Sequence, residues 1–491
     1  MKRIGTFRML KLTVAMALLA AGLASTGLAA RASAPYEGYN YNYWGEPVPA
    51  PIAYEPGGVI SGHTLGIGGF RAPEDLFVAP DGRVYIADTG NSRIVVLKPD
   101  LTVEREIAGF LNEGAAETFN APRGLYVTES GELYVADTGN RRIVLLDAAG
   151  ELIRVIESPQ SEILQANFIF TPVKVAADKA KRVYVVAQGA FDGIMEFDAD
   201  GAFAGFVGTN RVRFDPIDYF WKSIATDAQR QRMELFIPTE YTNVDLDAAG
   251  FIYTTNSDAN TPTPIKRLNP TGVDVLRRQG YYIPQGDLRF LRIGEGSGPS
   301  LFVDIHVGDD GIYSALDARR GKVFTYDWDG NLLYIFGKMG DQVGTFRAPV
   351  ALDRLGNAIL VLDRDMNRIT RFEETHYGAL INEAVSLHFR GDDVRSADVW
   401  REVIQYDANF DVAYLGISKA LLRQGRNKEA AAYAKLGMDR EIHSKAFQRY
   451  RKEVLREHLG DAMSAVALAA LLAWIWTLLR NRKRRRGTYH A

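Results

Sequence analysis

Between residues 59 and 373, short hydrophobic runs alternate with turn residues in a pattern that occurs six times. In each copy a first apolar run is followed by a turn with Gly or Lys, a second run, a polar motif and a third run. The first runs read DLFVA, GLYVT, VKVAA, NVDLD, DIHVG and ALDRL. Short alternating runs between turn signals predict β-strands, so this part of the chain is expected to be all-β.

The polar motif sets the period of the repeat. It pairs a polar residue with a later Ile or Val: Asp88/Ile94, Asp137/Ile143, Gln188/Ile194, Asn256/Ile265, Asp317/Val323 and Asp363/Ile369. Consecutive polar residues are 49, 51, 68, 61 and 46 positions apart. A period near this length with four strands per repeat is typical of a β-propeller blade. We therefore expect a mainly β fold with a six-bladed propeller over residues 59–376.

One phrase of the repeat is displaced along the chain. IFGKMGDQVGTFRAP (335–349) ends the fifth repeat, and VISGHTLGIGGFRAP (59–73) is the same phrase placed before the first. The sixth repeat lacks this ending after Phe372. A strand around Val59 is therefore predicted to complete the last blade and close the ring, which removes exposed sheet edges.

The repeats YIADTGNSRIVVL, YVADTGNRRIVLL and ILVLDRDMNRITRF resemble those of the NHL-repeat family of six-bladed propellers. A short polar side chain before a Gly-Asn turn accepts backbone N–H bonds. Asp88 and Asp137 are therefore interpreted as structural residues, because six copies around a ring do not form one active site.

NHL-like propellers also resemble gluconolactonase-like sugar-lactone hydrolases and peptide-amidating lyases, and this resemblance implies a divalent metal at the channel mouth. The positions where the lactonases place carboxylate and Asn ligands hold one carboxylate, a cation and aliphatic residues: Glu74, Arg123, Val173, Thr242, Val303 and Val350. Hard cations need several oxygen ligands. The lyases use several imidazoles, whereas His306 is the one histidine in the first runs. We therefore predict no catalytic residue, metal or cofactor.

One position further along each first run, the residues are Asp75, Gly124, Lys174, Asn243, Asp304 and Ala351. These residues form either a polar ligand site, a lysine-centred acid–base group, or a hydrated channel with a satisfied ion pair. The candidate binding residues at the mouth are Glu74, Asp75, Arg123, Lys174, Asn243, Asp304 and His306.

Two insertions, 208–240 and 277–299, make the ring asymmetric. Asp215 and Pro216 suit a helix start in the first. Their aromatics either line a rim for a sugar or peptide, or pack onto the blades: Tyr219, Phe220, Trp221, Tyr281 and Tyr282. The aspartate-rich stretches 198–201 and 327–331 are predicted to be hairpin turns rather than calcium loops. The segment 35–58, rich in aromatics and Pro, either wraps the propeller or stays extended.

From about Tyr377 the periodicity becomes helical. AYLGISKALLRQGRNKEAAAYAKLGMD (413–439) resembles one tetratricopeptide repeat, with Trp400 in the preceding helix. Helices at 378–388 and 443–458 are expected to flank it, since a single repeat rarely suffices for stability. This α-helical module, residues 377–460, serves either as a grip for a partner peptide or as a stalk.

Both chain ends predict membrane targeting. Residues 1–34 combine four cations with the apolar stretch Leu12–Ala24, as in a secretory signal peptide. A transmembrane helix is predicted over 461–480, followed by the basic tail 481–491, which favours a cytoplasmic C-terminus. Without the four cations of 1–11 and the six of 480–491, the net charge changes from −2 to −12. Such an acidic ectodomain repels phosphate backbones, so no nucleic-acid partner is predicted.

The sequence thus predicts a single-pass protein of the cell membrane with an extracellular propeller. We expect a non-catalytic binding or scaffolding module for a protein partner or an extracellular carbohydrate or peptide. The alternative is a metal-dependent lactonase-like hydrolase or lyase. The chain has no cysteine, which excludes disulfides, thiolate metal sites and a cysteine nucleophile.

Overall fold

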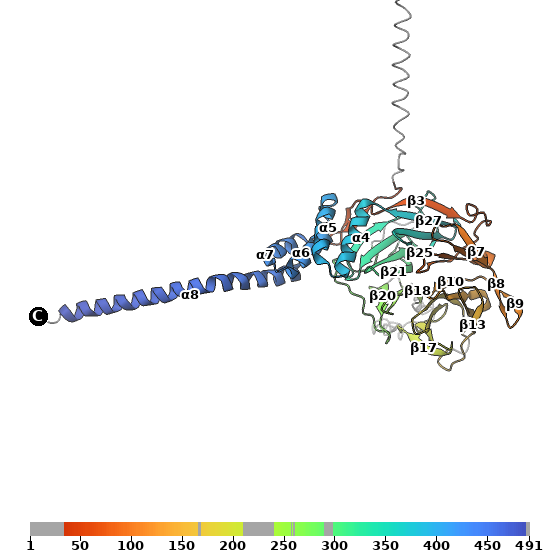
Figure 1. Ribbon diagram of the computed structural model, residues 1–491, viewed down its shortest axis with the longest axis horizontal. Coiled ribbons are helices and arrows are strands. Elements are labelled where there is room, and N and C mark those ends of the chain that lie inside the picture. The colour runs from red at the N-terminus through yellow and green to blue at the C-terminus, as the bar shows by residue number, and fades with distance from the viewer. Residues whose placement is uncertain are drawn as a thin grey trace, which may run out of the picture. The chain divides into compact units, whose positions relative to one another are not determined.

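The computed structural model describes residues 34–164, 168–209, 240–256, 258, 261–288 and 298–487. The chain divides into the units Met1–Ala34 and Pro35–Ala491, and the second contains every element below. Six antiparallel sheets of three or four strands form the blades, and each inner strand contacts those of both neighbouring blades. The fold is the predicted six-bladed β-propeller (Figure 1).

The blades are numbered from the first complete repeat. Blade 1 contains β4 (Asp75–Val78), β5 (Val84–Asp88), β6 (Arg93–Leu97) and β7 (Val103–Ile107). Blade 2 contains β10 (Gly124–Val127), β11 (Leu133–Asp137), β12 (Arg142–Leu146) and β13 (Leu152–Ile156). Blade 3 contains β14 (Pro172–Ala177), β15 (Val183–Ala187), β16 (Ile194–Phe197) and β17 (Phe203–Val207).

The second half of the ring has one incomplete blade. Blade 4 contains β18 (Tyr241–Leu246), β19 (Ile252–Asn256) and β20 (Ile265–Leu268). Blade 5 contains β21 (Phe302–Val307), β22 (Ile312–Asp317), β23 (Lys322–Asp327) and β24 (Leu332–Phe336). The prediction of four strands per blade is wrong for blade 4 over its described residues. A single bridge, Leu268 to Asp274, takes the place of the fourth strand beside β20.

Blade 6 contains β25 (Pro349–Leu355), β26 (Ala358–Asp363), β27 (Arg368–Glu374) and the N-terminal β3 (Tyr54–Ser61). Strand β3, red in Figure 1, lies beside β27, with Val59 opposite Thr370 and Ile60 opposite Ile369. The predicted closure is therefore confirmed, and the strand begins a few residues before position 59. Pairing the two ends of the propeller sequence removes an open sheet edge.

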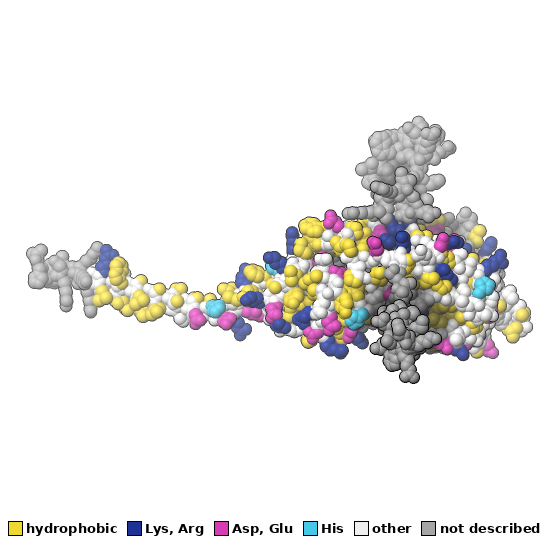
Figure 2. Space-filling view, turned by 90° about the horizontal axis from the view of Figure 1, so that it is seen from above, with side chains coloured by type: hydrophobic (Ala, Val, Ile, Leu, Met, Phe, Trp, Pro, Cys, Tyr) yellow, Lys and Arg dark blue, Asp and Glu magenta, His cyan; other side chains and the backbone are white. Residues whose placement is uncertain are grey.

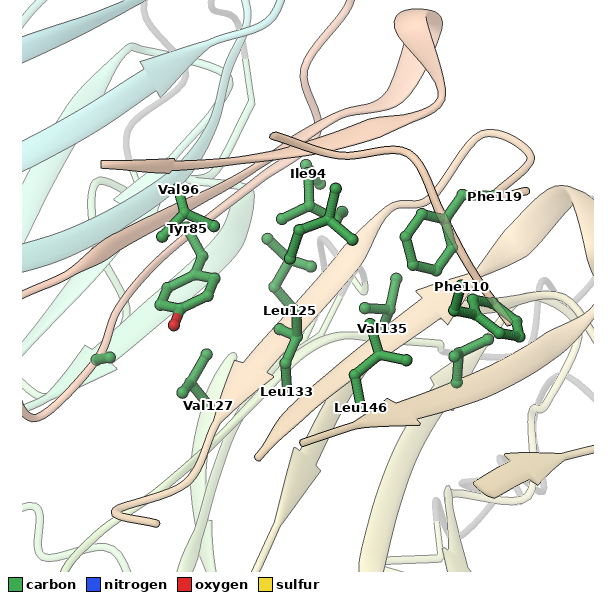
Figure 3. Packing of buried hydrophobic residues seen from close by; sticks show 14 residues of the cluster. Tyr85, Ile94, Val96, Phe110, Phe119, Leu125, Val127, Leu133, Val135 and Leu146 are labelled. Carbon is green, nitrogen blue, oxygen red and sulfur yellow. The ribbon is translucent and has the colours of Figure 1, made fainter. Parts of the chain in front are cut away.

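Adjacent blades pack face to face through apolar side chains. The middle strands β5 and β11 are buried at every residue, because each lies between two neighbouring blades. Figure 3 shows Ile94, Leu125 and Val135 in the cluster that joins blades 1 and 2. The hairpin of β8 (Gly109–Asn112) and β9 (Ala115–Thr118) adds Phe110, and Phe119 follows it. The apolar runs of the repeat thus become the contacts between blades.

The motif aspartates are structural, as the repeat predicted. Asp137 is fully buried, and its carboxylate accepts hydrogen bonds from the Asn120 backbone N–H at 2.7 Å and from Asn140 and Arg142 at 2.9 Å. Asp88 makes the equivalent bonds in blade 1. Short 3₁₀ turns follow both aspartates, Thr89–Asn91 and Thr138–Asn140. Each motif joins the start of the inner strand to the end of the second strand.

The N-terminal segment wraps around blade 5. Strands β1 (Tyr39–Tyr41) and β2 (Pro47–Pro49) form a hairpin, and β1 contacts β24. The Tyr39 and Tyr41 hydroxyls donate to Asp287 at 2.8 and 2.7 Å. Lys322 also pairs with Asp287, at 3.0 Å. Of the two alternatives for residues 35–58, the structure shows the wrapped one.

After the propeller the chain is helical. The helices are α4 (His376–Phe389), α5 (Asp393–Tyr406), α6 (Asp411–Arg423), α7 (Asn427–Leu436) and α8 (Arg440–Gly487), and each contacts the next. A Cβ on Gly416 would lie 2.3 Å from the Trp400 indole nitrogen, so glycine is required where α6 crosses α5. The predicted helices at 378–388 and 443–458 are present. The tetratricopeptide resemblance of this module stays a prediction.

The β23–β24 turn joins the helical module to blade 5. The residues Asp327–Asn331 form a hairpin turn, as predicted, with Gly330 N–H bonded to the Asp327 carbonyl at 2.9 Å. Asp329 pairs with Arg277 at 2.9 Å and with Lys419 of α6 at 3.0 Å. Trp328 contacts Phe389 of α4 edge to face at 5.7 Å. The predicted turn at 198–201 is also present, since Gly201 N–H bonds the Asp198 carbonyl.

One described helix is long and apolar enough to cross a membrane. In α8 the most apolar window has a mean hydropathy of 2.1 and no buried residue. Figure 2 shows hydrophobic side chains along the C-terminal part of this helix. The predicted boundary at residue 460 lies inside this helix, because α8 runs from Arg440 without a break.

Candidate functional site: the central channel

The inner strands of the six blades line the central channel. Successive side chains of a strand point to opposite faces, so positions two apart share the channel face. Of the predicted ring, Asp75, Lys174, Asn243 and Asp304 line the channel cavity as an upper tier, whereas Ala351 packs in the apolar cluster between blades 6 and 1. Two positions further along lies a lower tier of cavity-lining residues: Phe77, Tyr126, Asp245, His306 and Asp353.

The upper tier is centred on one ion-paired lysine. Lys174 contacts Asp75 at 2.5 Å and Asp304 at 3.2 Å, from blades 1 and 5 on either side of the channel. Asn243 donates to the Ile305 carbonyl at 3.2 Å and lies outside this ion pair. At Gly124 a Cβ would lie 2.7 Å from the Val173 carbonyl oxygen, so only glycine fits between blades 2 and 3.

Burial governs the charge state of this tier. It raises the pKa of Asp304 to about 7, a shift that Lys174 opposes and the neighbouring Asp75 increases. The pKa of Asp75 is raised for the same reason, and Lys174 again opposes the shift. Burial alone would lower the pKa of Lys174, but the two carboxylates outweigh it and hold the ammonium charged. One cation thus compensates two buried acids.

The lower tier contains a second charged group. His306 Nδ1 lies 2.7 Å from Asp353. Burial lowers the pKa of His306, but the carboxylates of Asp353 and Asp245 outweigh this effect and raise the pKa to about 9. Burial raises the pKa of Asp245 to about 6 although His306 opposes this. Sequence analysis missed Asp245 and Asp353. Their signal was the two-residue alternation, which places them on the channel face after Asn243 and Ala351.

The channel carboxylates also join neighbouring blades. Asp75 accepts the Leu125 backbone N–H at 2.8 Å, and Asp304 accepts that of Leu352 at 2.6 Å. Asp353 accepts the Val78 N–H at 2.6 Å, across the seam between blades 6 and 1. Asp245 accepts the Val307 N–H at 2.9 Å. Charge-assisted bonds of this kind link strands that share no sheet ladder.

The space left in the channel is small. The cavity between the two tiers has a volume of about 30 Å³, close to the volume that one or two water molecules need. Over the described residues, no group of three or more His, Asp and Glu side chains has the arrangement of a metal site. The side chains at the mouth also do not fit the metal that the enzyme resemblance implies, because Arg123 and three valines stand at four of the six positions.

The remaining residues predicted at the channel mouth contact neighbouring blades or strands. Glu74 lies 3.8 Å from Arg364 of the adjoining blade 6 rather than pairing with Arg123. The Thr242 hydroxyl bonds the Phe302 carbonyl at 2.9 Å and Thr255 at 2.6 Å. The structure therefore brings Asp75, Lys174 and Asp304 together, with His306 one tier below, and leaves Glu74 and Arg123 apart.

The predicted aromatic rim is described in part. Tyr219, Phe220 and Trp221, like the helix start at Asp215, lie outside the described residues. Tyr282 stacks on Tyr41 of the N-terminal hairpin with 3.8 Å between ring centroids. Tyr281 contacts Tyr43 edge to face at 5.3 Å. These two tyrosines pack against the wrapped N-terminal segment, a partner that local sequence did not identify.

Two segments of this chain, residues 70–97 and 119–144, match the NHL repeat. They begin before the inner strands of blades 1 and 2 and extend into the third strands. No curated protein matches the chain in sequence. The chain thus carries NHL repeats, and this finding confirms the resemblance seen in blades 1 and 2.

Several solved structures are similar in fold. A virginiamycin B lyase from Staphylococcus aureus aligns with 61% of this chain and 94% of its own, at 12% identity and a TM-score of 0.38. A protein of unknown function from Bacteroides thetaiotaomicron VPI-5482 aligns over 69% and 76%, at 12% identity and a TM-score of 0.41. A putative gluconolactonase aligns over 69% and 98%, at 13% identity and a TM-score of 0.40.

Proposed function

We propose that this six-bladed propeller with NHL repeats is a membrane-anchored, non-catalytic binding or scaffolding module. The observation that carries the proposal is that four channel carboxylates already accept a backbone N–H from the next blade: Asp75, Asp245, Asp304 and Asp353. Their role is to close the ring. A catalytic carboxylate would instead have to face a substrate, and the channel cavity of about 30 Å³ is too small for one.

The lysine-centred group in the upper tier also has a structural role in this proposal. An acid–base lysine acts near neutral pH when its pKa is lowered, whereas the two aspartates raise the pKa of Lys174. The ion pair therefore supports the alternative of a structural channel over that of a proton-transfer site. Ligands would bind elsewhere on the outer surface, where the N-terminal segment and the helical module lie.

We further propose that α8 crosses the cell membrane once, with the propeller outside and the C-terminus in the cytoplasm. Arg480 and five further cations follow the apolar segment, and cytoplasmic flanks carry such excess positive charge. Because the chain has no cysteine, a single introduced cysteine provides its only thiol for labelling. Ser130→Cys, on an exposed turn, should react with a membrane-impermeant maleimide in intact cells, and Thr488→Cys only after permeabilisation. The reverse pattern would refute this orientation.

The non-catalytic proposal is tested on the full chain purified in detergent. Lactones and amidated peptides should be cleaved no faster than in buffer, and a chelator should leave the melting temperature unchanged. A metal bound only by the folded state would raise stability by mass action, so its removal would lower the melting temperature. Glu74→Ala should alter neither result. A chelator-sensitive lactonase activity that disappears in Glu74→Ala would replace this proposal with the hydrolase alternative.

A further inference from the structure

Positive charge gathers in one stretch of the helical module. Residues 423–456, from the end of α6 through the first part of α8, hold ten Lys and Arg and four Asp and Glu, a net charge of +6. Residues 12–479 together carry a net charge of −12. The charge of this stretch is therefore opposite in sign to that of the ectodomain as a whole.

Three of these cations lie on one face of α8. Arg449, Lys452 and Arg456 follow one another at spacings of three and four residues, which places them on the same side of a helix. All three are exposed, and none forms an ion pair with a described Asp or Glu. Glu453 and Glu457 each follow a cation by one residue, so they point about 100° away around the helix. We call Arg449, Lys452 and Arg456 the basic stripe.

Contacts with α6 and α7 hold the stripe beside one end of the helical module. The Arg449 guanidinium donates to the Leu422 carbonyl in the last turn of α6 at 3.3 Å. The Asn427 amide, at the start of α7, donates to the Glu453 carboxylate. Lys428 is exposed in the same first turn of α7 and adds a cation at this end. The loop between α6 and α7 therefore lies next to the stripe.

The apolar segment of the same helix sets the distance from the stripe to a bilayer. Helix α8 runs from Arg440 to Gly487 without a break, and the predicted span begins at residue 461. At about 1.5 Å per residue, Arg456 lies roughly 8 Å before the span and Lys452 roughly 14 Å before it. The headgroup layer on each side of the hydrocarbon core is about 5–8 Å thick. In a bilayer crossed by α8, Arg456 therefore lies at the headgroups, and the long side chain of Lys452 extends towards them.

We propose that the basic stripe and the neighbouring α6–α7 loop bind the headgroups of anionic phospholipids, so that the helical module rests on the outer membrane surface. The proposal rests on the proposed crossing of the membrane by α8 and adds a lipid ligand to it. Charge and position both favour this occupant, since exposed cations without an acid partner stand on a helix that enters the bilayer a few residues later. An acidic protein segment would match the charge but not the position beside the apolar segment.

The experiment uses the full chain in nanodiscs of phosphatidylcholine alone and of equal parts phosphatidylcholine and phosphatidylglycerol. Gln424→Cys, on the exposed α6–α7 loop, supplies the only thiol, and its rate of modification by a neutral, polymer-linked maleimide reports how closely the loop approaches the lipid. The rate should be about threefold or more lower in the anionic discs, because the loop is held against the headgroups. The difference should disappear at about 1 M salt, where the Debye length is roughly 3 Å.

Two pairs of substitutions in the Gln424→Cys chain test the stripe itself. Lys452→Gln with Arg456→Gln removes two stripe cations and should make the rates in the two lipids equal. Lys435→Gln with Arg440→Gln is the matched control, since it removes two exposed cations where α7 meets the start of α8, roughly 30 Å before the span. This control should keep the difference between the lipids.

Equal rates for the parent in both lipids would overturn the proposal, as would an unchanged difference in Lys452→Gln with Arg456→Gln or an equal loss in the control pair. Slower labelling in neutral discs on adding polyglutamate, without a response to phosphatidylglycerol, would overturn it in favour of an acidic protein partner. Labelling of Ser130→Cys and Thr488→Cys reports the crossing itself and does not depend on the stripe. Failure of the lipid proposal is therefore distinguishable from failure of the proposed membrane crossing.

Discussion

Replacing Asp137 with alanine should strongly destabilise the propeller. The carboxylate is fully buried and serves three donors: the Asn120 backbone N–H, the Asn140 amide and the Arg142 guanidinium. Alanine leaves the Asn120 N–H without its carboxylate acceptor and removes the buried partner of a cation. Breaking a buried ion pair by removing one partner costs about 3–5 kcal/mol. Arg142 keeps its contact with Glu117, which favours the lower end of this range.

The assay is thermal unfolding of the purified full chain by scanning calorimetry. With an unfolding entropy of about 2.1 cal/mol/K per residue, a loss of about 3–5 kcal/mol corresponds to a fall in melting temperature of about 4–8 °C for a propeller of about 320 residues. Asp137→Asn keeps an oxygen that accepts the Asn120 N–H, so its melting temperature should fall by less. Asp200→Ala removes a side chain that is 92% exposed on a hairpin turn, and it should melt with the parent. The reasoning is refuted if Asp137→Ala also melts with the parent.

Three further outcomes are expected. Deleting residues 35–61 removes β3, so the propeller should aggregate or melt far below the parent; an equally stable monomer would show that β3 does not close the ring. His306 has a folded pKa of about 9 against 6.5 unfolded, so its contribution is fully present below pH 6.5 and lost as pH rises through 9. Denaturant titrations from pH 6.5 to 9 should show this loss in the parent and not in His306→Gln. Tyr39→Phe and Tyr41→Phe together remove two hydroxyl donors to Asp287 and should speed proteolysis of the N-terminal hairpin; an unchanged cleavage rate would contradict the wrapped arrangement.

Sequence patterns identified the repeat because a blade is a local structure. Four neighbouring strands connected by short turns leave their signature in runs such as RVYIA and IVVLK, and the buried strands β5 and β6 correspond to them. Closure by β3 was also predictable, since the displaced phrase at 59–73 duplicates one inside the ring. Equivalent positions in the six first runs placed Asp75, Lys174 and Asp304 on one predicted ring, and in the structure Lys174 contacts both carboxylates.

The repeat pattern gave a wrong prediction in blade 4, where the sequence differs most from the other repeats. In blade 4 the stretched motif Asn256/Ile265 predicted a strand order that holds for three strands, but in the described part of the segment after β20 a single bridge replaces the fourth strand. Asp245 and Asp353 were not predicted, because they lie two positions beyond the predicted ring. Their importance depends on the distance to His306 in the neighbouring blade, which no single repeat encodes.

By itself the sequence determined the elements that depend on neighbouring residues: the strands and turns of the propeller, the helices after Tyr377 and the apolar segment at the C-terminus. The tertiary structure decided which distant side chains meet. It placed Lys174 between Asp75 and Asp304 and wrapped Tyr39 and Tyr41 onto Asp287. The physical reason is that periodicity reports which face of an element is apolar, whereas distances between elements are set by packing of the whole ring.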